Sequence, residues 1–234
     1  MLPVSVYCMP GMAASPKIFE FLDLPSPYVV KTLHWIPPKP RESIAAYAKR
    51  MCAFITTENP ILLGVSFGGV LVQEMAKIIS TQKVVIVSSI KSNQELPLPM
   101  KMANRTQIHK LLPLQWIENL DTLALFAFGP RLKKRISLYQ KYLSERDPNY
   151  LRWAIDALVY WGQKEPTEAV LHIHGHGDLV FPAKNLADPV HFISGGHAII
   201  LTQATWFNTH LPKLLGEKSN FFTFSEILVY VLFP

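Results

Sequence analysis

The sequence predicts an α/β fold with a mostly parallel central sheet. Short apolar segments rich in β-branched residues alternate along the chain with segments of helical periodicity. The segment "KVVIVSSI" at residues 83–90 is apolar at successive positions, which is typical of a strand buried on both faces of a parallel sheet. Together these observations indicate strands that are joined by crossover helices.

Six segments are expected to form strands, because each is short, apolar and bounded by turn residues. They are residues 3–8, 28–34, 61–65, 83–90, 170–175 and 189–195. Three helices are expected between and after them, at residues 43–55, 67–79 and 202–215. Ser43 is expected to cap the first of these helices, since serine is favoured at a helix N-cap.

Residues from about 92 to 166 interrupt this alternation. The segment shows no convincing strand and contains prolines and helix-forming stretches rich in Leu, Trp, Phe and Lys. Two interpretations stay open: helices packed on the sheet, or a helical cap insert that lies over the strand ends and roofs a pocket. We expect a single domain over residues 1–234 that carries this insert.

The composition excludes several classes of protein. At 234 residues, 49% hydrophobic and 17% charged, the chain suits a folded domain and not a disordered one. The net charge is +6, but the basic residues are scattered and the densest cluster is "RLKKR" at 131–135, so no nucleic-acid partner is expected. The two cysteines, Cys8 and Cys52, do not imply a disulfide framework in a chain of this size, which favours a reducing compartment and a cytoplasmic protein.

Neither end of the chain, nor any segment between, carries a recognisable targeting or membrane-spanning signal. The first residues lack a basic region before an expected strand, so no signal peptide is expected. No window reaches the roughly 18 apolar residues of a spanning helix, so no membrane span is expected. Residues 221–234 are unusually apolar. A docked helix or strand, a dimer contact and a peculiarity of the reading frame all stay open, and with them a homo-oligomer.

One serine lies between glycines where an expected strand meets an expected helix. The segment "GVSFG" at 64–68 fits the pattern G-x-S-x-G, and its position after a strand and before a helix is the one that the pattern requires for catalysis. Gly64 and Gly68 lack side chains, so strand and helix can approach each other closely. Such a turn would present the Ser66 hydroxyl at the carboxyl end of the sheet.

A serine hydroxyl needs a base, and the base needs a group that orients it. Asp178 follows the expected strand at 170–175, and His197 follows the strand at 189–195. All three residues therefore follow strands of one sheet, at the edge where parallel strands end. The order Ser66, Asp178, His197 is the order in which an α/β-hydrolase triad occurs along a chain.

With "PGM" at 10–12, "GVSFGG" at 64–69, "HGHGD" at 174–178 and "GGH" at 195–197, the sequence resembles the α/β-hydrolases. It is similar to compact bacterial members that lack the first strands of larger relatives, over essentially the whole chain to about residue 215. The resemblance implies Ser66 as nucleophile, Asp178 as acid and His197 as base. It also implies an oxyanion hole formed by the backbone N–H groups of Met12 and Phe67.

The chain departs from this family at two places. Pro10-Gly11 stands where many members have His-Gly, which leaves a backbone donor in place. The apolar tail beyond about residue 215 has no counterpart in the family.

Other side chains suggest competing sites. His172, His174 and His176 alternate ahead of Asp178 and invite a metal site, but Gly175 and Gly177 indicate that the strand has ended by then. We therefore expect no metal. Glu95 follows the fourth strand, where some relatives carry the acid, and is the alternative to Asp178. No glycine-rich nucleotide motif follows any strand, so no cofactor is expected.

The sequence thus predicts a serine hydrolase that cleaves a carboxylic ester or thioester of a small, partly apolar substrate through an acyl-enzyme. An acyltransferase or a lyase on the same fold is one alternative, and arginines facing the pocket would favour a lyase with a polyanionic substrate. Four arginines of interest lie in the insert: Arg105, Arg131, Arg135 and Arg152. A non-catalytic protein that binds a small molecule is the other alternative.

Overall fold

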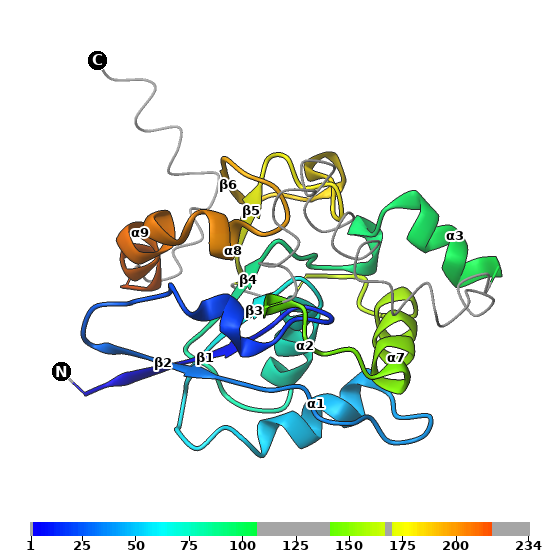
Figure 1. Cartoon of the computed structure of the whole chain (residues 1–234), viewed down its shortest axis with the longest axis horizontal. Helices are drawn as coiled ribbons and strands as arrows, with labels where there is room; N and C mark the ends of the chain where they lie inside the picture. The colour runs from blue at the N-terminus through cyan, green and yellow to red at the C-terminus, as the bar shows by residue number, and fades with distance from the viewer. Residues whose placement is uncertain (1, 107–140, 167–169, 217–234) are drawn as a thin grey trace.

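The computed structural model describes residues 2–106, 141–166 and 170–216. The described strands form one parallel sheet (Figure 1). The strands are β1 (Val4–Met9), β2 (Tyr28–Thr32), β3 (Ile61–Val65), β4 (Lys83–Val87), β5 (Val170–Gly175) and β6 (His191–Ile193). All six expected strands are confirmed; the bounds of β3 and β5 match the expected ones, and the ends of the other strands differ by at most three residues.

The strand order is β2-β1-β3-β4-β5-β6. The chain runs outward from β1 to β2 and then crosses back to place β3 on the other side of β1. The pairing sets Val6 beside Ile61 and Met9 beside Gly64. The strands all run parallel, but β2 is added on one side of β1 and β3 on the other. Because the order of strand addition reverses at β1, the connections that follow β1 and β3 leave the sheet on opposite faces. A crevice forms at such a switch point, and ligands of open α/β sheets bind there.

Helices cover both faces of the sheet. In Figure 1, α1 (Ile44–Cys52) and α2 (Phe67–Ala76) lie on one side of the strands, and α8 (Ile199–Thr202) and α9 (Ala204–Gly216) lie on the other. Ser43 caps α1 as expected, since the N–H of Ala46 donates to its Oγ at 3.2 Å. The helix expected at 202–215 differs: it starts earlier and is divided at Gln203, whose φ of −124° is not helical.

The remaining described elements are short helices and two helices of the insert. They are η1 (Pro16–Phe19), η2 (Asn93–Glu95), α3 (Leu98–Thr106), α7 (Pro148–Val159) and η5 (Ala183–Asn185). None of the described helices is long and apolar enough to cross a membrane.

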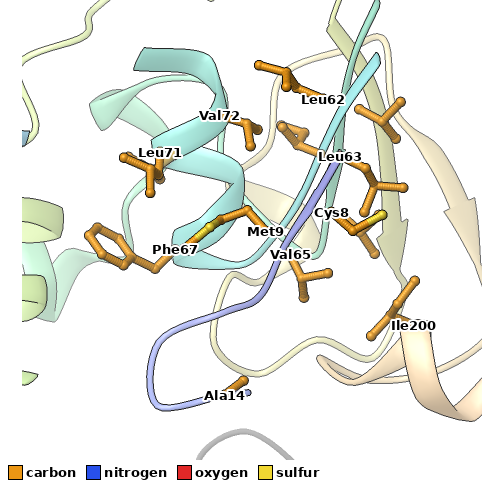
Figure 2. Close-up of a cluster of buried hydrophobic side chains, with 14 of the residues drawn as sticks. Cys8, Met9, Ala14, Leu62, Leu63, Val65, Phe67, Leu71, Val72 and Ile200 are labelled. Carbon is orange, nitrogen blue, oxygen red and sulfur yellow. The ribbon is translucent and has the colours of Figure 1, made fainter. Parts of the chain in front are cut away.

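The core lies where β3 packs against α2 (Figure 2). Every residue of β3 is buried, and Leu71 and Val72 of α2 are fully buried as well. Burying one such aliphatic side chain contributes about 1.5–3 kcal/mol. The turn between β3 and α2 is therefore held at both ends by the best-packed part of the protein.

The insert expected at 92–166 is described only in part. Its helix α7 begins at Pro148, and the side chain of Asp147 accepts the N–H of Tyr150 at 2.8 Å as a cap. Residues 107–140 lie outside the described residues, and so do the arginines at 131 and 135. The cap insert and the single domain therefore stay predictions. Residues 221–234, whose role the sequence leaves open, also lie outside the described part of the chain.

Candidate active site

Ser66 occupies the turn between β3 and α2 in a backbone conformation that is rare for a residue with a side chain. Its φ is 53° and its ψ is −122°. Three hydrogen bonds hold the strained residue: its N–H donates to the Val87 carbonyl at 2.8 Å, and its own carbonyl accepts the N–H of Gly69 at 2.9 Å and the hydroxyl of Ser89 at 2.7 Å. Strain of this kind persists only where surrounding contacts enforce it.

The glycines on either side of Ser66 allow the strand and the helix to approach each other. A Cβ atom on Gly64 would lie 2.3 Å from the carbonyl oxygen of Gly68. A Cβ atom on Gly68 would lie 2.3 Å from the carbonyl oxygen of Pro10 and 2.5 Å from that of Met9. All three distances are below van der Waals contact, so a side chain at either position would push neighbouring backbone aside. The close approach inferred from the sequence is therefore observed.

The structure brings together the three side chains that the sequence singles out. The hydroxyl of Ser66 lies 2.9 Å from Nε2 of His197, and Nδ1 of the same ring lies 2.8 Å from Oδ2 of Asp178. Because an ionised carboxylate only accepts hydrogen bonds, Nδ1 carries the proton of the neutral ring. Nε2 is then free to accept the proton of Ser66. The side chain of His197 is 11% exposed, while that of Asp178 is completely buried.

The carboxylate of Asp178 accepts three hydrogen bonds and lies close to a second histidine ring. Oδ1 accepts the N–H groups of Val180 at 2.8 Å and Phe181 at 3.0 Å, and Oδ2 accepts His197 and lies 3.3 Å from Nε2 of His174. Burial alone raises the pKa of Asp178, but the charge and hydrogen bond of His197 and the N–H of Phe181 outweigh it. The pKa therefore lies below its ordinary value of 3.8, and the group stays ionised.

His172 and His174 continue this hydrogen-bonded chain into the sheet. Nε2 of His174 lies 2.8 Å from the carbonyl of Phe181, to which it donates, and Nδ1 lies 3.2 Å from Nε2 of His172. These contacts engage both nitrogens of His174 and Nε2 of His172, while Nδ1 of His172 is buried without a hydrogen-bond partner among the described residues. Within the described ranges, no group of three or more His, Cys, Asp or Glu side chains is arranged to hold one.

The loop after β1 lies directly beside Ser66. A Cβ atom on Gly11 would be 3.2 Å from the Cβ of Ser66 and 3.9 Å from its Oγ. The N–H of Met12 takes no part in the hydrogen bonds of this loop among the described residues. Phe67 is the first residue of α2, so its N–H has no partner inside the helix. Both expected oxyanion donors are thus close to Ser66 in sequence or in space.

Glu95, the alternative acid, is used elsewhere. Its Oε2 accepts the N–H of Lys91 at 2.6 Å, and its Oε1 accepts the N–H of Ala187 at 2.9 Å. The carboxylate therefore ties the loop after β4 to the loop before β6, whereas His197 is bonded to Asp178. Arg152 is exposed and lines a surface depression of about 820 Å³ beside residues 38–44.

Sequence reasoning missed two residues that support the site. The hydroxyl of Ser89 bonds the Ser66 carbonyl, and the indole N–H of Trp35 donates to the Gly11 carbonyl at 3.0 Å. A serine after a strand and a single tryptophan in a loop carry no periodic signal. Only the sheet, which places the loops after β1, β2, β3 and β4 side by side, reveals their contacts.

Three solved structures with the same architecture share 11–18% sequence identity with this chain. A hydrolase from Pseudomonas aeruginosa superposes with a TM-score of 0.70 at 14% identity, over 92% of this chain and 91% of that one. The protein has the α/β-hydrolase fold. A bromoperoxidase from Bacillus anthracis (TM-score 0.64, 18% identity, 92% of each chain) shares it. So does a thermophilic esterase from Thermogutta terrifontis (TM-score 0.65, 11% identity, 92% of this chain and 90% of that one).

No family model and no curated protein sequence matches the chain. At these identities the α/β-hydrolase fold is what the likeness establishes. The fold prediction made from the sequence is therefore confirmed, including the compact sheet. The reaction depends on the residues of the site itself, because this fold carries many chemistries.

Proposed function

We propose that the protein is a serine hydrolase that cleaves a carboxylic ester or thioester of a small, partly apolar substrate. The observation that carries the proposal is the hydrogen-bonded series from the Ser66 hydroxyl to Nε2 of His197 and from Nδ1 of that ring to Asp178. A serine in this setting can lose its proton to the imidazole as it attacks a carbonyl carbon. Hydrolase and esterase neighbours on the same fold are consistent with it.

In the first half of the reaction, Oγ of Ser66 bonds to the carbonyl carbon while its proton moves to Nε2 of His197. The N–H groups of Met12 and Phe67 stabilise the oxyanion, each contributing about 3 kcal/mol to lowering the barrier. The bond to the leaving alcohol or thiol then breaks, and His197 returns the proton to it. Asp178 holds the ring in the tautomer with Nδ1 protonated and stabilises the imidazolium.

In the second half, water attacks the acyl-enzyme by the same route. His197 takes a proton from the water, the tetrahedral intermediate collapses, and Ser66 leaves with that proton while the acid is released. Transfer to another acceptor instead of water would make the protein an acyltransferase with the same residues.

We also propose a cytoplasmic location, since Cys8 and Cys52 are both free thiols.

A fluorophosphonate probe tests the proposal, because it phosphonylates only a serine that a base has activated. We expect the wild type to be labelled and Ser66→Ala and His197→Ala to remain unlabelled. Ser43→Ala, which removes only the exposed N-cap of α1, is the matched serine control and should be labelled like the wild type. A folded wild type that resists labelling would favour the non-catalytic binding protein. Labelling without turnover of acyl esters would favour the transferase or lyase.

A further inference from the structure

Trp35 lies in the segment that follows β2, 31 residues before Ser66 in sequence, yet its indole reaches the site. The side chain is 9% exposed. Its Nε1–H donates to the carbonyl oxygen of Gly11 at 3.0 Å, and this hydrogen bond is buried. The same oxygen accepts the N–H of Ala14 at 3.1 Å, so both of its lone pairs have a partner.

The Gly11 carbonyl and the Met12 N–H belong to one peptide group. In a trans peptide the two bonds point in opposite directions in a rigid plane. A donor that anchors the carbonyl therefore determines the direction in which the N–H points. Hydrogen bonds also polarise one another through a shared group, so a bonded carbonyl makes the N–H of the same peptide a stronger donor.

The face of the same indole packs on the residue after the nucleophile. The rings of Trp35 and Phe67 stack with centroids 5.4 Å apart and planes 12° apart. Phe67 is itself 1% exposed, so it has little room to move. One side chain therefore contacts the peptide of the first expected oxyanion donor through a hydrogen bond and the residue of the second through stacking.

We propose that Trp35 is the positioning residue of the oxyanion hole, which sets the direction of the Met12 N–H relative to that of Phe67. The inference rests on the proposed function of the Ser66 site. Trp35 touches no reacting atom and acts only through the two backbone donors. Its removal is therefore expected to weaken stabilisation of the tetrahedral intermediate and to leave binding of the substrate ground state intact.

Trp35→Phe removes the Nε1–H and keeps an aromatic ring for stacking. Trp153→Phe is the matched control, because Nε1 of Trp153 donates to a backbone carbonyl as well, that of Glu42 at 2.8 Å, and its ring also packs on Phe67, at 5.9 Å. With p-nitrophenyl acetate, we expect kcat to fall about tenfold in W35F with KM within about twofold of wild type, a smaller loss than deletion of a donor causes. W153F should keep both constants within about twofold.

A second readout addresses the oxyanion itself. A trifluoromethyl ketone forms a tetrahedral adduct with an activated serine, and its oxyanion needs the two donors. We expect its inhibition constant to rise about tenfold in W35F and to stay unchanged in W153F. A tryptophan that only supports the fold would lower the melting temperature of both variants without this difference.

The outcomes separate the two proposals. A wild type that neither turns over esters nor reacts with fluorophosphonate overturns the proposed function and this inference with it. An active wild type with W35F equal to W153F overturns the inference alone. Should W35F not fold, the wild type decides: in 15N-tryptophan-labelled protein, the indole resonance with a through-space contact to Gly11 must shift downfield on addition of the trifluoromethyl ketone. An unchanged resonance would contradict the proposal.

Discussion

At the scale of single residues, His172 and His174 are unusual because they are imidazoles buried in the middle of a parallel strand. Burial, with the neighbouring His174 and Lys91, lowers the pKa of His172 to about 2. Burial also lowers the pKa of His174, although Asp178 acts in the opposite direction. Both rings are therefore neutral in the folded protein at pH values where an unfolded chain binds protons.

This difference makes the protein sensitive to acid. The folded pKa values lie below the ordinary 6.5, so the stabilising effect of the neutral rings is complete above pH 6.5 and is lost as the pH falls below it. His172, whose folded pKa lies far below 6.5, contributes a slope of up to about 1.4 kcal/mol of unfolding free energy per pH unit below that pH. We expect His172→Leu to remove this slope. Urea unfolding between pH 8 and 5 measures it.

The slope and not the absolute stability is the readout, because the leucine also leaves Nδ1 of His174 without its donor. Above pH 7 the curves of wild type and variant should run parallel. Curves that stay parallel down to pH 5 would show that His172 takes up its proton in the folded protein as readily as in the unfolded one.

At the scale of secondary-structure elements, the site depends on how closely α2 approaches the end of β1. Gly68 is the point of contact, since the carbonyl oxygens of Met9 and Pro10 lie where its Cβ would be. The loop with the expected Met12 donor begins directly after these two residues. The distance between helix and strand therefore also sets the distance between Ser66 and the loop.

We expect Gly68→Ala to destabilise the protein by about 1–3 kcal/mol through overpacking, although alanine is the better helix former. The fluorophosphonate labelling rate should fall as well, because the displaced backbone of Met9 and Pro10 leads directly into the loop with the expected Met12 donor. Gly162→Ala is the control, since a Cβ there would meet no atom of the described residues within 4 Å apart from those of its chain neighbours. Chemical denaturation and labelling rates of both variants check this. Equal behaviour of the two alanine variants would show that the contact at Gly68 yields without cost.

At the scale of the whole molecule, loops from distant parts of the chain meet at one edge of the sheet. Two buried carboxylates serve different purposes there. Asp178 accepts the Nδ1–H of His197, while Glu95 accepts N–H groups from the loop after β4 and from the loop before β6. The sequence alone ranked these two residues as alternatives for one role, and the packing separates them.

The two carboxylates should respond differently to neutral replacements. Asp178→Asn is expected to slow fluorophosphonate labelling by about 10³-fold or more, because the amide no longer selects the tautomer with Nδ1 protonated. The Glu95→Gln variant should have a free energy of unfolding about 1–3 kcal/mol below that of the wild type. Its rate of fluorophosphonate labelling should stay within about twofold of the wild-type rate. Labelling kinetics, measured under conditions in which both variants are folded, report the effect on the site. Denaturation curves report the effect on stability. A large loss of labelling in Glu95→Gln alone would reverse the assignment.

Much of the fold could be predicted from the sequence because its signals are local. The apolar strands, the Ser43 cap and the glycines around Ser66 each depend on a few neighbouring residues. The chain order of Ser66, Asp178 and His197, each after a strand, then predicted that they would meet. The hydrogen bonds among the three side chains agree with that expectation.

Other features were decided only by the tertiary structure. The strand order, the tie made by Glu95, the burial of His172 and the reach of Trp35 to Gly11 all join segments that are far apart in the chain. A local pattern indicates which residues form a strand or a helix. It does not indicate which side chains of other elements come within hydrogen-bond distance of that strand or helix. That depends on which loops the crossovers bring to the same edge, and packing settles it for the whole chain at once.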